Sequence, residues 1–342
     1  MQDERVAEVT KVLREHEVMA AHNAFAPAFL SPLWGQTEDW LDSIDIFLSE
    51  CFDAFLVPCS DLNSTSVNVR WQNAVGKPAW ILRTSAQLHY AHQPISKAQW
   101  LLYGAACKAN GCRVFGPCGA STRPDTTTSP AMLANVKTGF DFFMGDSDLQ
   151  EDAESAARIG LVFSWATRKY SPGGSMDWCE EFHGWARLLM EEHLPYNVVI
   201  AEKVTNPDDL AGYDLLVLPG ITITGATFCS ALGEFVRRGG RILATSVTSL
   251  HDEIGCQLPD FRMGSLLGVS WRGSVDGPFA IERPGEQEPA HGAFQQVETS
   301  GQVLSYRMEV DPAGSVGGML DPLPINVSCW PAQKRLPRQT VG

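Results

Sequence analysis

The sequence predicts an α/β protein made of two domains with parallel sheets. Three observations support this. Short apolar runs alternate with helical patterns, and each run is an uninterrupted apolar stretch in which apolar and polar residues do not alternate. An acidic stretch, "DSDLQEDAESA" (146–156), then interrupts the alternation of runs and helices. Alternating strands and helices are typical of parallel sheets. Continuous apolar runs indicate strands that are covered on both faces. The acidic stretch predicts a domain boundary near residue 150.

The first predicted domain, residues 1–150, begins with an amphipathic charged helix, "MQDERVAEVTKVLREHE". Four strand-like runs follow in order: "EVMAAHNA" (17–24), "IDIFLSE" (44–50), "AWILRTS" (79–85) and "GCRVFGP" (111–117). Further helices are predicted at 64–76, 96–111 and 128–145. The helix at 96–111 starts at a serine N-cap and ends at a glycine, which are signals for helix ends.

The second predicted domain, residues 151–275, repeats the alternation. Its strands are expected at 158–164, 196–202, 214–220 and 241–247, and its helices at 176–193 and 226–240. This order predicts a doubly wound, flavodoxin-like sheet. Residues 276–342 are expected to form a short β-rich or irregular segment, with a hairpin at 293–310 that turns at Ser300-Gly301. The last residues, "SCWPAQKRLPRQTVG", show no pattern of a packed element.

The composition excludes several classes of function. The net charge of −14 over 342 residues argues against a nucleic-acid partner, which would need basic surface. No run of eighteen apolar residues exists, so we expect no membrane span. The first residues lack a signal-peptide core, which predicts a cytoplasmic protein. The nine cysteines match no zinc spacing and are interpreted as buried thiols in a reducing compartment, with no metal site.

Several stretches of the second domain resemble the trimerisation domain of family 42 β-galactosidases and related clan-A glycoside hydrolases. They are "ARIGLVFSW", "EFHGWARLLMEEHLPYNVV", "LAGYDLLVLPG", "LGEFVRRGGRILATS" and "SLLGVSW", within residues 156–273. Residues 11–145 are similar to the second half of the preceding barrel, through "GKPAWIL", a helix ending in "KANG", and "TGFDFF". The resemblance implies a partial (β/α)8 TIM-type barrel followed by a flavodoxin-like domain, which is also the fold of class I glutamine amidotransferases. It also implies a carbohydrate substrate and a homo-oligomer, with a trimer among the candidate states.

The same resemblance shows what this chain lacks. A TIM barrel needs eight strands, and only four barrel-type strands precede the acidic stretch. In the family an Asn-Glu pair supplies the general acid/base, and no Asn-Glu pair occurs here. The family's nucleophile ends the seventh strand, where this chain has Arg83, Thr84 and Ser85. The resemblance therefore implies glycosidase ancestry with an incomplete catalytic pair, as in a fragment or a chain inactive alone.

One carboxylate occupies a position that catalysis in a barrel would require. A glycosidase uses two carboxyl groups, and in a barrel they come from the carboxyl ends of strands. Glu50 ends the run "IDIFLSE" and is our candidate catalytic residue, as a nucleophile or a ligand of a sugar hydroxyl. The alternative is a carboxylate that only stabilises a helix N-terminus.

Other candidates share a location on loops at predicted strand ends, where binding residues concentrate. The predicted substrate-binding residues are His22, Asn23, Trp34, Arg83, His89, Tyr90 and Arg123. Trp34 could form an aromatic platform for a sugar ring. The alternative for each is a polar or aromatic residue without a catalytic role.

The second domain offers no convincing catalytic residue. In amidotransferases the nucleophilic cysteine lies in the turn directly after a strand, but here that turn reads "PGITITG" and Cys229 falls within the next helix. We interpret Cys229 as a packing residue, and Asp252 and Glu253 as turn or interface residues. "YSPGGS" (170–175) lacks a phosphate-loop pattern, and no organic or metal cofactor is expected. The sequence thus predicts a glycoside hydrolase-like protein acting on O-glycosidic bonds; the alternative is a non-catalytic oligomerisation or sugar-binding protein.

Overall fold

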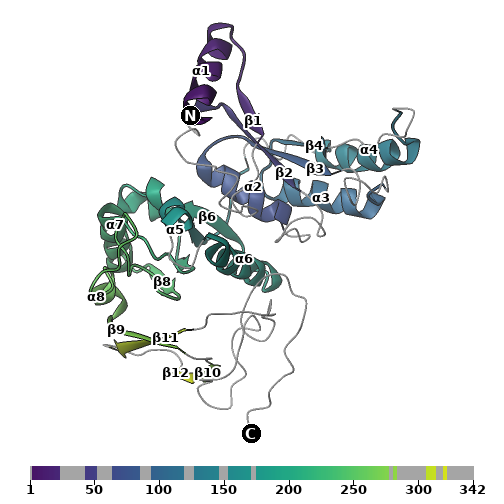
Figure 1. Cartoon of the computed structure of the whole chain (residues 1–342). Coiled ribbons are helices and arrows are strands. Elements are labelled where there is room, and N and C mark those ends of the chain that lie inside the picture. The colour runs from purple at the N-terminus through teal and green to yellow at the C-terminus, as the bar shows by residue number, and fades with distance from the viewer. Residues whose placement is uncertain are drawn as a thin grey trace. The chain divides into compact units, whose positions relative to one another are not determined.

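A computed structural model of the chain divides into two compact units, Met1–Ala156 and Ala157–Gly342 (Figure 1). Each unit is described by itself. The described residues are 2–23, 43–51, 64–84, 94–118, 127–145, 153–170, 175–276, 280–282, 306–312 and 319–321.

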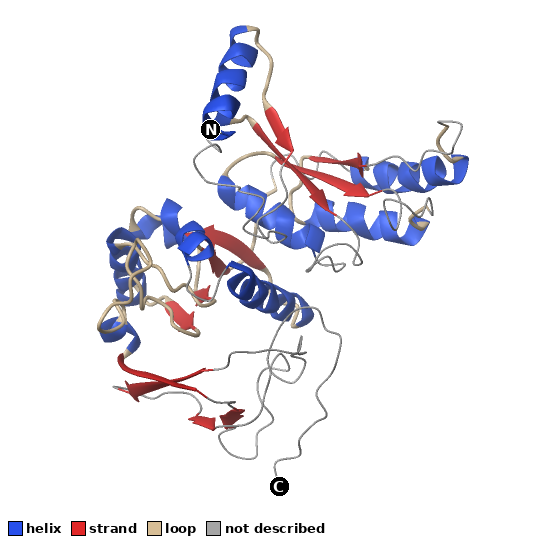
Figure 2. Ribbon diagram, viewed as in Figure 1, coloured by secondary structure: helices blue, strands red, loops and turns tan. Residues whose placement is uncertain are grey.

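The first unit contains a four-stranded parallel sheet in the order β1-β2-β3-β4 (Figure 2). Its elements are α1 (Gln2–Glu15), β1 (Ala21–Asn23), β2 (Ile46–Cys51), α2 (Ser64–Val75), β3 (Ala79–Thr84), α3 (Lys97–Ala109), β4 (Val114–Cys118) and α4 (Pro130–Met144). The predicted alternation of parallel strands and helices is therefore confirmed. The strand predicted at 17–24 begins later than expected, at Ala21, and residue 24 lies outside the described residues.

The first residues of that predicted strand instead form hydrogen bonds with the end of α1. The Val18 amide donates to the Leu13 carbonyl at 2.9 Å, and Glu17 adopts a left-handed φ of 57°. These bonds continue the helix terminus by one turn, because carbonyls at a helix end need donors from the residues that follow. Within the described part of this run, Ala21–Asn23 pair with β2 as a strand.

Both ends of α3 are fixed by local hydrogen bonds, as the sequence predicted. The Ser96 side chain accepts from the Gln99 amide, and the Gln99 side chain accepts from the Ser96 amide, which is a capping box. At the other end Gly111, with a φ of +76°, donates from its amide to Lys108. A left-handed glycine at this position is the usual way to end a helix.

Helices α2, α3 and α4 pack on one face of the sheet (Figure 2). Phe115 of β4 lies between Trp100 of α3 and Phe143 of α4, with ring centroids 5.4 and 5.7 Å away. Gly104 and Gly139 allow α3 and α4 to approach closely. A Cβ on Gly139 would lie only 2.8 Å from the Trp100 carbonyl oxygen.

The second unit contains another four-stranded parallel sheet, in the order β6-β5-β7-β8. Its elements are β5 (Ile159–Phe163), α5 (Trp165–Tyr170), α6 (Ser175–Glu191), β6 (Tyr196–Ile200), η5 (Ala201–Lys203), η6 (Pro207–Leu210), β7 (Leu215–Leu218), α7 (Ala226–Arg237), β8 (Arg241–Ala244) and α8 (Gly264–Leu267). From the central strands the chain moves outward in both directions, so right-handed connections place α6 and α7 on opposite faces. Phe163 of β5 packs against Trp178 and Phe182 of α6 at 5.0 and 5.4 Å.

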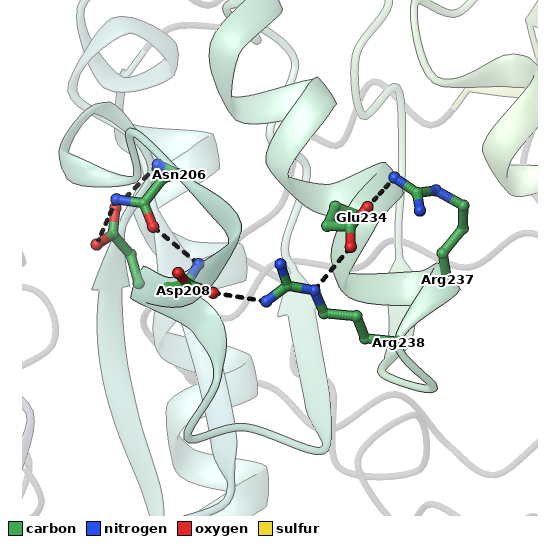
Figure 3. A network of polar contacts seen from close by, with 6 residues as sticks. Asn206, Asp208, Glu234, Arg237 and Arg238 are labelled. Carbon is green, nitrogen blue, oxygen red and sulfur yellow. Dashed lines mark hydrogen bonds and ion pairs between the residues drawn. The ribbon is translucent and has the colours of Figure 1, made fainter.

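A polar network on the surface joins η6 to the end of α7 (Figure 3). The Asn206 side chain accepts from the Asp208 amide at 2.9 Å and caps η6. Arg238 then donates to Asp208 at 2.6 Å and to Glu234 at 2.7 Å, while Arg237 also pairs with Glu234. Arg237, Arg238 and Asp208 are largely exposed, whereas Glu234 is mostly buried. Ion pairs with exposed partners add little to stability, so we attribute to the network mainly local order at the end of α7.

Short strands follow α8. β9 (Val269–Asp276) pairs antiparallel with β11 (Tyr306–Pro312), and β10 (Ala280–Glu282) pairs with β12 (Met319–Asp321). The expected hairpin at 293–310 would pair its two halves with each other. In the structure its described residues, 306–310, belong to β11, which pairs with β9 instead. Its expected turn at Ser300-Gly301 lies outside the described residues.

The close approach of α3 and α4 predicts that Gly139→Ala destabilises the first unit. An added methyl group would press against backbone, and overpacking of this kind costs about 1–3 kcal/mol. Gly116→Ala is the matched control, because its Cβ would make an ordinary 3.5 Å contact with Leu82. Urea unfolding of both variants measures the difference, and equal stabilities would contradict the packing described.

Candidate functional site

The carboxyl edge of the first sheet carries Glu50, the penultimate residue of β2. On the same strand the Phe47 ring packs against Trp71 of α2 at 5.1 Å, and the Cys51 sulfur accepts from Asn68 of α2 at 2.9 Å. Side chains of a strand point alternately to its two faces. Since Phe47 and Cys51 face α2, Glu50 lies on the opposite face of the sheet.

Arg83 at the end of β3 lies on the face covered by helices. Its guanidinium carbon is 3.9 Å from the centre of the Tyr103 ring, and its Nη1 donates to the Ser64 hydroxyl at 3.4 Å. The residue is fully buried. Burial raises the pKa of the neighbouring Cys51 thiol, and the Arg83 charge opposes that shift. These contacts give Arg83 a structural role within the first unit.

The neighbours of Glu50 on its own face are aromatic and aliphatic. The sheet register pairs Glu50 with Leu82 and Leu48 with Trp80, and all four residues are partly buried. Gly116, the partner of Leu82 on β4, adds no side chain to this face. Glu50 is thus the polar residue at the end of a face that also carries Leu48, Leu82 and Trp80. Ligand sites commonly combine apolar walls with a few polar groups.

Trp80 was not among the residues predicted from the sequence. The signal was present, because Trp80 lies two residues before Leu82 in a strand and therefore shares its face. What the sequence did not contain was the register between β2 and β3, which makes Leu82 a neighbour of Glu50.

The remaining predicted residues are placed only in part. The register sets Asn23 beside Leu48, two residues before Glu50, and His22 beside Phe47. Asn23, the last residue of β1, is therefore level with Leu48, and Glu50 lies two residues further toward the carboxyl edge. Trp34, His89, Tyr90 and Arg123 lie outside the described residues.

The carboxyl edge of the second sheet holds a desolvated acid, Glu181 of α6. The Thr245 hydroxyl donates to Glu181, and the Gly220 amide donates to that same hydroxyl at 3.2 Å. Burial raises the pKa of Glu181, and the hydrogen bond from Thr245 lowers it in part. Gly220 has a φ of +49°, and a Cβ there would lie 2.6 Å from Glu181 Oε2.

Cys229 lies within α7, as the sequence predicted, and burial raises the pKa of its thiol. A thiol with a raised pKa is a poor nucleophile. Asp252 closes a turn by accepting from the amides of Ile254 and Cys256 at 3.1 and 2.8 Å. Glu253 pairs with Arg262 at 2.6 Å. These residues therefore have structural roles within the second unit.

In the part of the chain that the structure describes, no group of three or more metal-ligating side chains is placed to hold an ion. None of the helices in the described ranges is long and apolar enough to cross a bilayer.

Comparison with known proteins relates this chain to β-galactosidases. Residues 157–267 match the family model of the β-galactosidase trimerisation domain. β-Galactosidase BgaA of Planococcus sp. (strain 'SOS Orange') is 25% identical over 140 residues, which cover 39% of this chain and 20% of that protein. β-Galactosidase BgaP of Planococcus sp. (strain L4) is 26% identical over 141 residues, with the same coverage of 39% and 20%.

Solved β-galactosidase structures share the fold over almost the whole chain. The enzyme of the haloarchaeon Halorubrum lacusprofundi superposes with a TM-score of 0.69 at 15% identity, covering 95% of this chain and 52% of its own. Gan42B, a GH42 β-galactosidase, gives a TM-score of 0.65 at 13% identity, covering 92% and 49%. The protein is thus an α/β protein with parallel sheets whose fold resembles that of GH42 β-galactosidase structures. More particularly, the chain is GH42 β-galactosidase-like: residues 157–267 match the trimerisation domain of these enzymes, and the chain spans about half the length of the solved structures.

The desolvated acid of α6 predicts a stability that falls as pH rises. A folded-state pKa above the ordinary value of 4.5 means that the folded protein binds this proton more tightly than the unfolded chain. The contribution to stability is therefore fully present below about pH 4.5 and is lost as pH rises through the folded-state pKa.

Glu181→Gln cannot ionise and still offers an acceptor to Thr245. We expect its unfolding midpoint to exceed that of the wild type at pH 8, with the gap closing toward pH 4.5, in thermal unfolding followed by circular dichroism. Glu192→Gln changes an exposed carboxyl just after the same helix and corrects for the loss of one negative charge. A Glu181→Gln midpoint below that of the wild type at pH 8 would refute the assignment.

Proposed function

We propose that this chain is a glycoside hydrolase-like protein that acts on O-glycosidic bonds of a carbohydrate, with Glu50 as a catalytic carboxylate. The observation that carries the proposal is the position of Glu50. It stands at the carboxyl end of a parallel strand, on the face opposite α2, beside Leu82. The β-galactosidases that match the chain in fold and in part of its sequence support the choice of a carbohydrate substrate.

Under this proposal residues 1–150 form part of a (β/α)8 barrel, and residues 151–275 form the flavodoxin-like trimerisation domain. In such barrels the helices lie outside, the strand residues of the other face fill the interior, and catalytic groups stand at the carboxyl ends of strands. Leu48, Trp80 and Leu82 are suited to the interior. Glu50 is suited to the catalytic end, since it follows Leu48 on the same face.

The chemistry requires two carboxyl groups, one to assist the leaving oxygen and one to attack the anomeric carbon or activate water. Glu50 is the only carboxylate within β1, β2, β3 and β4. It would supply one member of the pair. The second member would come from residues outside the described ranges or from another polypeptide. Asn23, at the end of the adjacent strand, is suited to bind a sugar hydroxyl.

One observation favours a second function, a non-catalytic sugar-binding or oligomerisation protein. At the end of β3, where the resemblance places the family's nucleophile, the chain has Arg83 and Thr84. Arg83 is fully buried against Tyr103 and cannot take over the role of a carboxylate. In this alternative Glu50 binds a sugar hydroxyl without chemistry.

A panel of nitrophenyl glycosides tests the two functions. We expect turnover by the wild type and a loss of about 10²-fold or more in Glu50→Gln, in line with the loss of an acid–base group. Asp141→Asn, which removes an exposed carboxylate on α4, is the control and should keep full activity. Absence of turnover combined with sugar binding that weakens in Glu50→Gln would support the second function, and absence of both would reject the two proposals.

The trimerisation-domain match leads us to propose a homo-oligomer, with a trimer as the expected state. Size-exclusion chromatography with light scattering should give a mass about three times the 37.4 kDa of one chain. A single-chain mass at micromolar concentration would count against this assembly.

A further inference from the structure

The end of α3 brings two cysteine side chains together. The Gly111 amide donates to the Lys108 carbonyl at 3.3 Å, and the Cys112 amide donates to the Cys107 carbonyl at 3.0 Å. With the left-handed Gly111 these two bonds define a Schellman motif. In this motif the residue after the glycine contacts the residue three positions before the helix cap. Here those two residues are Cys112 and Cys107.

The two thiols are neighbours in the core cluster of the first unit. Burial and, after it, a hydrogen bond with Cys112 raise the pKa of the Cys107 thiol, and the two residues are 0% and 3% exposed. The Cys112 sulfur also lies 3.2 Å from the Ala79 carbonyl oxygen and 3.1 Å from that of Val114. Both cysteines are reduced in this structure. The pair is therefore held in contact by backbone hydrogen bonds on both sides.

We propose that Cys107 and Cys112 form a redox-active dithiol, which a peroxide converts into an intrachain disulfide between the end of α3 and the segment before β4. This site is independent of the proposed glycosidase function. Cys112 precedes β4 at the amino edge of the sheet, whereas Glu50 stands at the carboxyl edge. The disulfide would thus change the stability of the first unit without altering a residue of the candidate sugar site.

The reaction balances with hydrogen peroxide as the oxidant. Cys112 lies between the exposed Gly111 and Arg113, so we assign the first step to its sulfur. The Cys112 sulfur attacks one peroxide oxygen, the O–O bond breaks, and the thiol proton leaves with the other oxygen as water, which gives a sulfenic acid. Burial raises the pKa of the Cys107 thiol, which is the poorer nucleophile of the pair, so its sulfur acts second. It attacks the Cys112 sulfur, the S–O bond breaks, and the Cys107 proton leaves with the hydroxyl group as a second water. Two thiols and one peroxide become one disulfide and two waters.

A third buried thiol, Cys51, lies in the same core and provides an internal control. It belongs to β2, and its sulfur accepts a hydrogen bond from Asn68 at 2.9 Å. No backbone turn brings it to either partner, in contrast to the turn that joins Cys107 to Cys112. We therefore expect it to remain a thiol while the other two react.

The experiment treats the full-length folded protein with hydrogen peroxide, denatures and alkylates it, and maps the peptides by mass spectrometry. We expect one species that has lost two hydrogens, a cross-link between Cys107 and Cys112, and an alkylated Cys51. Dithiothreitol should reverse the cross-link. Before reduction the unfolding midpoint of the first unit should rise by a few degrees, because the cross-link restricts the unfolded chain.

Two variants sharpen the outcome. Cys51→Ser should keep the cross-link, whereas Cys112→Ser should abolish it and leave Cys107 free for alkylation. The proposal is overturned if wild-type Cys107 and Cys112 are both alkylated after peroxide treatment, if either pairs with Cys51, or if the cross-link forms only in urea. The peptide map of the oxidised wild-type protein is sufficient to accept or reject the proposal. The test therefore remains valid even if a variant fails to fold.

Discussion

The first unit depends on one constraint, the burial of the Arg83 guanidinium between the sheet and its helices. A buried charge is costly unless its surroundings compensate for it, and here the Tyr103 ring and the Ser64 hydroxyl do so. A shift of β3 by one residue would move every side chain of the strand to the other face. The same shift would expose the packed residues Ala79 and Ile81. Arg83 therefore fixes which side chains face the helices, and through the sheet register it fixes the direction of Glu50.

The helix ends of the first unit form a second set of constraints that connects its layers. Asn110 caps α3. Its side-chain oxygen accepts a hydrogen bond from Arg70 at 2.5 Å, and its backbone carbonyl accepts one from Asn73 at 2.7 Å. Both donors belong to α2. The turn that contains Gly111 is thus held by a neighbouring helix as well as by its own bonds. This connection explains why two thiols can stay in contact there without a covalent bond.

The sequence predicted those features that short-range chemistry decides. Ser96 and Gly111 marked the ends of α3 because capping involves only residues within one turn. The parallel α/β class followed from the alternation of apolar runs with helices. The strand at 17–24 was too long because an apolar run does not reveal that Val18 still bonds back to α1.

The candidate site could be predicted only as a position along the chain. Glu50 was correctly placed at the end of a strand, but a continuous apolar strand does not show which face each residue takes. That information came from tertiary contacts, the packing of Phe47 on Trp71 and of Arg83 on Tyr103. Arg83 and Glu50 are both charged residues at strand ends in the sequence. The sheet register and the contacts with the helices are what distinguish the buried Arg83 from the candidate catalytic residue Glu50.

The turn at Gly220 has a consequence for protein engineering. In amidotransferases the nucleophile lies in the turn directly after a strand, whereas here the space above Gly220 is taken by the Glu181 carboxyl group. Introducing a cysteine at position 220 alone would place a side chain where that carboxyl group already lies, on a backbone with a positive φ. A new nucleophile at this turn would therefore require a shorter side chain at 181 in the same design. Gly220 and Glu181 are sterically coupled, so a design that replaces one of them has to replace the other as well.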